Sequence, residues 1–386
     1  MSEDSEGETR TLYALIALCI ANHMVLVGSR VVVTLSALAQ GAGPAQVGVL
    51  LSLFAILPML IAVSAGRWSD RAGVRLPMLV GSVLLACGAA LPCALPGLAP
   101  LYVAAPLIGV AFSVFQIAAQ NATGELGGAL HRSRNFGLLA LGQSTSMIIG
   151  PLVAGFSIDH LGFDWAFGVL ALVPLLPAMV LAGGWLPALP GPHPLHADVA
   201  HGGVFALLAE PRLQRLFAVN ALFSLGWELH AIFIPIFGDS IGLSASAIGG
   251  VIAAFAAATF VVRFAMPLIA RRATERQVLT GALLVAGIAY CALPFARNAI
   301  ALMCASFGIG LGLGGGQPMV MSLLHTHAPP GRLGEAAGMR MSLGQSMAVA
   351  VPLIFGAFGA TFGVAPVLWS VGVCLTGGGL YARRKL

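Results

Sequence analysis

Residues 213–237 read LQRLFAVNALFSLGWELHAIFIPIF, an apolar run that carries a single carboxylate, Glu228, beyond its midpoint. As an α-helix, a run of this length exceeds the roughly 30 Å thickness of the hydrocarbon core of a bilayer. Similar runs recur along the chain, which is 58% hydrophobic and only 9% charged. Soluble domains are about a quarter charged. The chain therefore has too few charges to cover a water-facing surface, and the sequence predicts a polytopic membrane protein.

Twelve such runs can be delimited. They are Leu12 to Leu38, Gln46 to Ala65, Leu76 to Leu95, Leu101 to Asn121, Asn135 to Ile158, Trp165 to Trp185, Leu213 to Phe237, Ala245 to Ala270, Val278 to Phe295, Ala299 to Leu324, Leu333 to Phe362 and Ala365 to Tyr381. Backbone groups inside a bilayer have no water to bind, and strands of membrane barrels are about ten residues long with strict alternation. The predicted fold class is therefore all-α, with 12 transmembrane helices.

The basic residues predict the orientation of these helices. Arg297 alone falls on one side of the membrane, and the remaining loop and terminal residues fall on the other. That second group is Arg10, Arg67, Arg71, Arg75, Arg132, Arg134, Arg212, Arg215, Arg271, Arg272, Arg276, Arg332, Arg383, Arg384 and Lys385. Because cytoplasmic loops carry the excess of Lys and Arg, both termini are expected in the cytoplasm. The net charge of +5 then reflects topology, and no nucleic-acid partner is expected.

The chain matches itself at a shift of about 201 residues. Gly109 corresponds to Gly310, Gln116 to Gln317, and PLVAG at Pro151 to PLIFG at Pro352. The sequence therefore predicts two pseudo-symmetric six-helix bundles in the same orientation. We expect a cytoplasmic tail at 1–10, bundles at 11–186 and 212–386, and a cytoplasmic linker at 187–211.

The linker is rich in Pro, Gly and His. Its three histidines, His193, His196 and His201, have no acid or thiol cluster beside them that would favour a metal site. We interpret the segment as a solvated spacer and expect neither a metal nor a cofactor.

A loop signature lies between the second and third runs, in GRWSDRAGVRL at 66–76. It resembles the Gly-x-x-x-Asp-Arg-x-Gly-x-Arg signature of the major facilitator superfamily, carried by Gly66, Asp70, Arg71, Gly73 and Arg75. The resemblance implies a transporter of two six-helix bundles in a bacterial cytoplasmic (inner) membrane. It also implies that this loop is a conformational latch, which holds the two halves in the outward-open state.

A second, partial resemblance lies in LGQSTSMIIGPLVAG, at 141–155. It is similar to the Gly-Pro motif of antiporters in that family, through Gly142, Gly150, Pro151 and Gly155, and it favours export. The chain departs from the family at Ala105, where proton-coupled drug antiporters usually have an arginine.

Glu228 is the one acidic residue, of 14, that sits well inside a span. A charge at this depth usually faces protein or a water-filled cavity. At helical spacing Glu228 shares a stripe with Asn220 and Ser224. The repeat relates this stripe to one on the first helix that carries His23 and Arg30, and the resemblance implies that these two helices face each other across the pathway. We therefore expect a charge-compensated pair of Arg30 and Glu228, while His230 points away.

Other polar residues within the spans have two interpretations each. Gln116 and Gln120, with Gln317 in the second half, either bind substrate or bridge helices. Arg263 and Arg340 either extend to the interface or place positive charge at the inner mouth of the pathway.

These features favour a secondary transporter that works by alternating access over a membrane-embedded enzyme, a receptor or a channel. No nucleotide loop, metal cluster or nucleophile set supports an enzyme. We expect a monomer in the lipid bilayer that moves a small organic solute coupled to protons. Three arginines against one glutamate in the spans favour an anionic or neutral solute. The alternative is a proton-driven multidrug or sugar efflux antiporter.

Overall fold

The computed structural model describes residues 3–126, 128–186, 188–191, 210–269, 271–327 and 333–385. Every regular element within these ranges is helical, which confirms the predicted all-α class. The chain forms two compact units. The first contains Met1–Gly41 and Leu53–Ala197, and the second contains Ala42–Ser52 and Asp198–Leu386.

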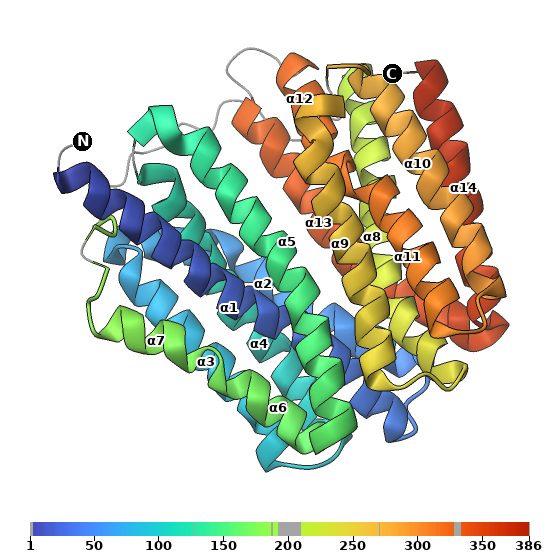
Figure 1. Cartoon of the computed structure of the whole chain (residues 1–386), viewed down its shortest axis with the longest axis horizontal. Coiled ribbons are helices and arrows are strands. Elements are labelled where there is room, and N and C mark those ends of the chain that lie inside the picture. Colours follow the sequence, from blue (N-terminus) through green and yellow to red (C-terminus); the bar gives the residue numbers. More distant parts are fainter. Residues whose placement is uncertain are drawn as a thin grey trace. The chain divides into compact units, whose positions relative to one another are not determined.

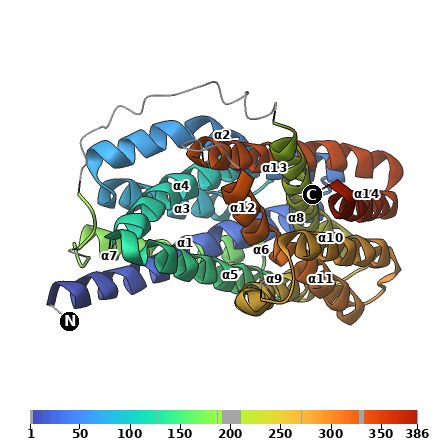
Figure 2. The ribbon, with the colours of Figure 1, turned by 90° about the horizontal axis from the view of Figure 1, so that it is seen from above.

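The helices up to the linker belong to the first unit, apart from the start of α2. They are α1 (Glu3–Ala39), α2 (Pro44–Ala72), α3 (Arg75–Ala94), α4 (Leu98–Glu125), α5 (Gly128–Leu161), α6 (Phe163–Leu172) and α7 (Leu175–Ala182). Within this unit α3 packs along α4 and α1 packs along α5, as Figures 1 and 2 show. The core between them includes Leu15, Met78 and Phe115, all fully buried.

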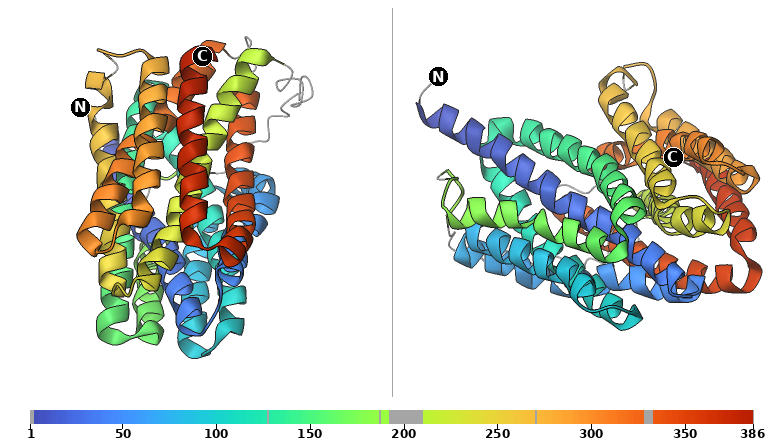
Figure 3. Two further views of the ribbon diagram at one scale, coloured as in Figure 1. Left: turned by 90° about the vertical axis from the view of Figure 1, so that its right-hand side faces the viewer. Right: turned by 60° about the horizontal axis from the view of Figure 1, so that its bottom comes forward.

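The second unit contains the remaining helices. They are α8 (Pro211–Ser240), α9 (Ala245–Ile269), α10 (Glu275–Ala292), the short 3-10 helix η2 (Leu293–Phe295), α11 (Ala299–Gly314), α12 (Gly316–His327), α13 (Leu333–Phe362) and α14 (Val364–Lys385). Here α9 packs along α11, and α10 packs along α14, the red helix of Figure 3. The packing of α3 against α4 in the first unit has its counterpart in the packing of α10 against α11 in the second, as the repeat predicts.

Twelve spans of the described residues are long and apolar enough to cross a membrane, in agreement with the twelve predicted runs. Two of these runs are broken within the span. The run 165–185 divides into α6 and α7 at Pro174, because proline lacks the N–H that continues a helix. The run 299–324 divides into α11 and α12 at Gly315, within a series of glycines. Glycine loses more conformational freedom in a helix than other residues do, and it has no side chain whose packing would offset that loss.

Glycine contacts repeat between the units at the same 201-residue shift. A Cβ added to Gly109 would meet the carbonyl oxygen of Phe54, and one added to Gly310 would meet that of Phe255. These four residues are related in pairs by the repeat. Each contact brings two helix backbones together where any side chain would intervene, as is common for helices packed inside a bilayer. The repeated pattern in the sequence therefore reflects repeated helix packing.

The Gly-rich stretch at 308–318 is likewise a packing surface. A Cβ on Gly312 would lie 2.5 Å from the carbonyl oxygen of Ala282 on α10, and one on Gly308 would lie 3.3 Å from Ala289 Cβ. Gly310 and Gly314 contact α9 instead. Helix α11 thus uses its glycines to approach two neighbours at once.

The loop between α2 and α3 turns at Gly73, which has a φ of +75°. Other residues rarely adopt this conformation, so the glycine is needed for the turn. Arg75 then donates a hydrogen bond from Nη2 to the carbonyl oxygen of Leu186, at 2.8 Å. Arg71 is exposed and Gly66 is half-buried, whereas the side chain of Asp70 lies outside the described ones. Arg75 therefore ties the start of α3 to the chain that follows α7, within the first unit.

We expect Gly310→Ala to lower the free energy of unfolding by about 1–3 kcal/mol, because the added methyl group overpacks the contact between α11 and α9. Gly281→Ala on α10 is the matched control, since nothing lies within 4 Å of a Cβ placed there. The control should leave stability unchanged or raise it by up to about 1 kcal/mol. Thermal unfolding of the purified variants measures the difference, and equal stabilities would contradict the packing argument.

We expect Arg75→Ala to speed amide hydrogen exchange in residues 183–186, because the Leu186 carbonyl loses a charged donor. We expect the exchange rate to rise about threefold or more, because a hydrogen bond from a charged group is lost even though part of it is exposed to water. Exchange measured by mass spectrometry should be unaffected in Arg71→Ala, which removes the same charge at an exposed position in the last turn of α2. Similar exchange in both variants would show that Arg75 acts only through its charge.

Candidate functional site

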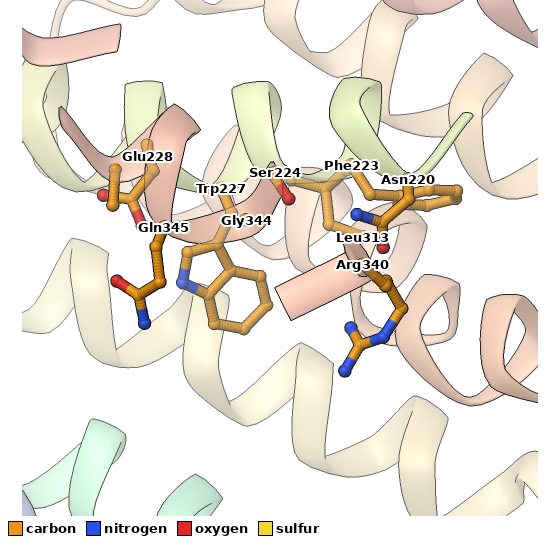
Figure 4. A pocket seen from close by; sticks show the side chains of 10 residues that line it. Asn220, Phe223, Ser224, Trp227, Glu228, Leu313, Arg340, Gly344 and Gln345 are labelled. Carbon is orange, nitrogen blue, oxygen red and sulfur yellow. The ribbon is translucent and has the colours of Figure 1, made fainter. Parts of the chain in front are cut away.

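A cavity of about 280 Å³ lies in the second unit. Helix α8 contributes one wall, α13 contributes another, and the end of α11 closes part of the space. Its lining residues are Asn220, Phe223, Ser224, Trp227, Glu228, Leu313, Arg340, Gly344, Gln345 and Ala348, shown as sticks in Figure 4.

The α8 wall follows from helical geometry. Asn220, Ser224 and Glu228 are four residues apart, which places them on one face of the helix, one above another. All three line the cavity. Asn220 is buried, while Ser224 and Glu228 are half-buried. The structure thus brings together the three members of the stripe that the sequence indicates.

Helix α13 supplies the facing wall. Gly344 lies beside Ser224, since a Cβ on this glycine would be 3.9 Å from the Ser224 hydroxyl oxygen. The absence of a side chain there leaves room between the two helices. Gln345 and Arg340 flank this glycine on α13 and present an amide and a guanidinium to the cavity.

Arg340 is the cation of the cavity wall. Its side chain is half-buried, and its Nε atom is buried with no hydrogen-bond partner among the described residues. In Figure 4, Arg340 and Glu228 lie toward opposite ends of the labelled group, with Trp227 between them. The cavity therefore presents a carboxylate and a guanidinium at separate positions. Arg340 thus lines the cavity, and its role in a transport pathway stays a prediction.

Trp227 connects the cavity to α9. Its ring makes an edge contact with Phe255, with centroids 4.9 Å apart, and the guanidinium carbon of Arg263 lies 6.0 Å from the indole centroid. Arg263 is thus directed at the back of the cavity wall and is not among the lining residues. A cation over an indole face is an attractive contact that restrains the ring.

Behind this wall lies a buried polar cluster. His230 is 2% exposed, stacks on Phe255 with centroids 4.1 Å apart, and shares a hydrogen bond of 3.1 Å with Ser306. The Tyr290 hydroxyl donates to the carbonyl oxygen of Gly226 on α8. These contacts hold the turn of α8 that carries Trp227 and Glu228, and they leave His230 outside the cavity.

The predicted polar residues of the first unit lie on several helices. His23 on α1 forms a hydrogen bond with Ser146 on α5, and its ring lies 5.3 Å from that of Phe112 on α4. Arg30 is half-buried. These contacts show His23 bridging three helices of the bundle.

The two glutamines on α4 differ in environment. Gln116 is buried, and both polar atoms of its side chain lack a hydrogen-bond partner among the described residues. Gln120 is half-buried. An amide buried in this way costs free energy unless another group completes its hydrogen bonds. The role of this pair stays a prediction.

Some predictions fall outside the described part of the chain. The side chain of Gln317 and the linker histidines His193, His196 and His201 are among these. Arg30 and Glu228 belong to different units, and their pairing stays a prediction.

Sequence reasoning missed six of the ten lining residues, including the polar or aromatic side chains of Trp227 and Gln345. Trp227 adjoins Glu228 but lies about 100° from it around the helix, so the stripe excluded it. Its large indole nevertheless reaches the cavity. Gln345 belongs to LGQS at 343–346, which repeats LGQS at 141–144. That repetition was a signal, but it carried no information about which face the glutamine occupies.

The family model that matches this chain is that of the Major Facilitator Superfamily, over residues 13–352. Among curated proteins, the chain is 28% identical to the class G tetracycline resistance protein of Vibrio anguillarum, over 86% of this chain and 85% of that one. It is 26% identical to the class C tetracycline resistance protein of Escherichia coli, over 86% and 84% of the two chains.

Solved structures show the same fold at low identity. A POT family transporter in complex with 5-aminolevulinic acid superposes with a TM-score of 0.79 at 14% identity, over 96% of this chain and 95% of that one. A bacterial homologue of the human lysosomal transporter Spinster, in an inward-facing conformation, gives 0.76 at 15% identity, over 100% and 96%. The family match, the twelve spans and the repeated bundles agree, and the chain belongs to the major facilitator superfamily as a multi-pass membrane transporter.

Proposed function

We propose that this transporter exports a small organic solute from the bacterial cytoplasm in exchange for protons, by alternating access, with Glu228 as the proton-binding group. The observation that carries the proposal is the position of Glu228 in the wall of a cavity that also offers Asn220, Ser224 and Arg340. A carboxyl group inside a span, open to a cavity, is suited to binding and releasing a proton during transport.

We propose exchange of solute for protons because both would bind in the same cavity. An ionised Glu228 can accept hydrogen bonds from a solute, or attract its positive group, and protonation removes that attraction. Proton and solute then bind the cavity at each other's expense, which is the requirement for antiport. A solute held only by Arg340 would instead bind better with Glu228 protonated and would travel with the proton.

The direction of transport rests on the relatives. Two proteins that align with most of this chain are named for tetracycline resistance. A transporter confers resistance when it removes the drug from the cytoplasm, so export is the direction we propose here. The Gly-Pro pair at Gly150 and Pro151 agrees with this. Gly150 also has a packing role, since a Cβ on it would lie 2.7 Å from the Met24 carbonyl oxygen of α1.

The cavity also bears on the solute. Glu228 and Arg340 together make its lining formally neutral, and Arg263 adds positive charge behind Trp227. An anionic or net-neutral solute with hydrogen-bond donors fits this distribution of charge better than a lipophilic cation does. Tetracycline, which the relatives are named for, is the first solute to test.

The location in the cell follows from the basic residues and the bacterial relatives. The excess of arginine in one set of loops supports cytoplasmic termini, and we propose the inner membrane as the site of action. The monomer is proposed as the functional form.

We expect Glu228→Gln to abolish transport driven by a pH gradient, because the amide cannot take up the proton, while solute exchange without a gradient persists. The measurement is uptake of labelled tetracycline into everted membrane vesicles, with and without a pH gradient. Saturable uptake by the unmodified protein is required first.

Asp239→Asn is the control for this prediction. Asp239 is an exposed carboxylate at the end of the same helix, outside the cavity, so its neutralisation should leave driven uptake unchanged. Gradient-driven uptake that survives in Glu228→Gln, or non-saturating flux in the unmodified protein, would refute the proposal.

A further inference from the structure

The lining of the cavity includes one large aromatic surface, the indole of Trp227, to which the proposed exchange of protons assigns no role. We infer that Trp227 is a stacking surface and that, with Arg340, it selects planar conjugated solutes that carry an anionic group at one edge, in addition to the hydrogen-bond donors through which the proposed exchange engages Glu228. This inference rests on the proposed function in taking the cavity as the solute site, and it adds the chemical class of the solute.

The first support is the way in which the indole is held. Phe255 meets it at an interplanar angle of 75°, and Arg263 lies over its ring. Phe255 is in turn stacked on the buried His230, which is bonded to Ser306 on α11. An aromatic side chain fixed from behind loses little conformational entropy when a ligand stacks on it, which favours binding.

The second support is the position of charge along the ring. Figure 4 shows the indole between the side chains of Gln345 and Arg340. The Nε of Arg340 has no hydrogen-bond partner among the described residues, although the atom is buried. A guanidinium binds carboxylates and other planar oxyanions through paired N–H donors. A flat solute lying on the indole would therefore bring an anionic substituent at its edge toward the guanidinium of Arg340, which lines the same cavity.

The third support is the shape of the remaining wall. Gly344 faces Ser224 without a side chain, and Ala348 follows one turn later on α13. Two small residues in the α13 wall leave room in a cavity whose lining also includes the indole, and such a space suits a flat ligand better than a globular one. Gln345, on the other side of the indole from Arg340 in Figure 4, can offer hydrogen bonds to such a ligand.

The test measures binding to the purified full-length protein by calorimetry, without any gradient. Three probes of similar size separate the two interactions. They are 2-naphthoate, its saturated analogue decahydro-2-naphthoate, and the uncharged 2-naphthamide. We expect naphthoate to bind the unmodified protein roughly threefold to tenfold more tightly than the saturated carboxylate, the range typical of an aromatic contact.

Variants assign these preferences to residues. Trp227→Leu should reduce the preference for the aromatic carboxylate to near unity, and Trp227→Phe should retain part of it. Arg340→Gln should weaken binding of naphthoate but not of naphthamide. Trp369→Leu is the matched control, since Trp369 lies on α14 outside the cavity, with its indole N–H bonded to the Cys291 carbonyl oxygen. If Trp227→Leu does not fold, Trp227→Met provides a flexible non-aromatic substitute.

The inference is overturned if the unmodified protein does not bind naphthoate, or if the preference for it survives in the Leu or Met variant. Failure of proton-driven flux is a separate result, because these measurements need no proton gradient. A protein that prefers planar anions but does not exchange them for protons would refute the proposed function and support this one. A protein that exchanges protons for solutes without regard to planarity would support the proposed function and refute this inference.

Discussion

The absence of water inside a bilayer is the constraint on which this structure depends. Each backbone N–H and C=O group in a span has to find its partner within the protein, which is why the described spans are helical. The same constraint removes most of the hydrophobic driving force between helices, so close packing has to hold them together. The glycine contacts at Gly109 and Gly310 are the result, and they occur at equivalent places in both units.

The absence of water also constrains the polar side chains within the spans. A charged group in a span is costly unless protein or water surrounds it. Glu228 and Arg340 meet this condition by lining a cavity, and His230 meets it by bonding to Ser306 within the bundle. Two of the residues least compatible with hydrocarbon thus line the cavity, which is the physical reason for proposing this cavity of the second unit as the solute site.

Much of the fold was predictable from the sequence because its determinants are local. The length of each apolar run predicts a span, and the repeat relates the two bundles. The internal breaks were not predicted. Pro174 and Gly315 interrupt helices that hydropathy treats as continuous, because hydropathy measures the cost of leaving water and ignores backbone geometry. The role of Arg75 was also hidden, since its partner, the Leu186 carbonyl, is distant in the sequence.

The candidate site, too, was predictable from the sequence only in part. Helical periodicity alone determined that Asn220, Ser224 and Glu228 share a face, because a spacing of four residues is a property of the helix itself. Only the tertiary structure decided that Arg340 and Gln345 line the same cavity as that face and that the indole of Trp227 lines it too. Long or broad side chains reach in several directions, and the direction taken depends on neighbours such as Phe255 and Arg263, which the order of residues along the chain does not reveal.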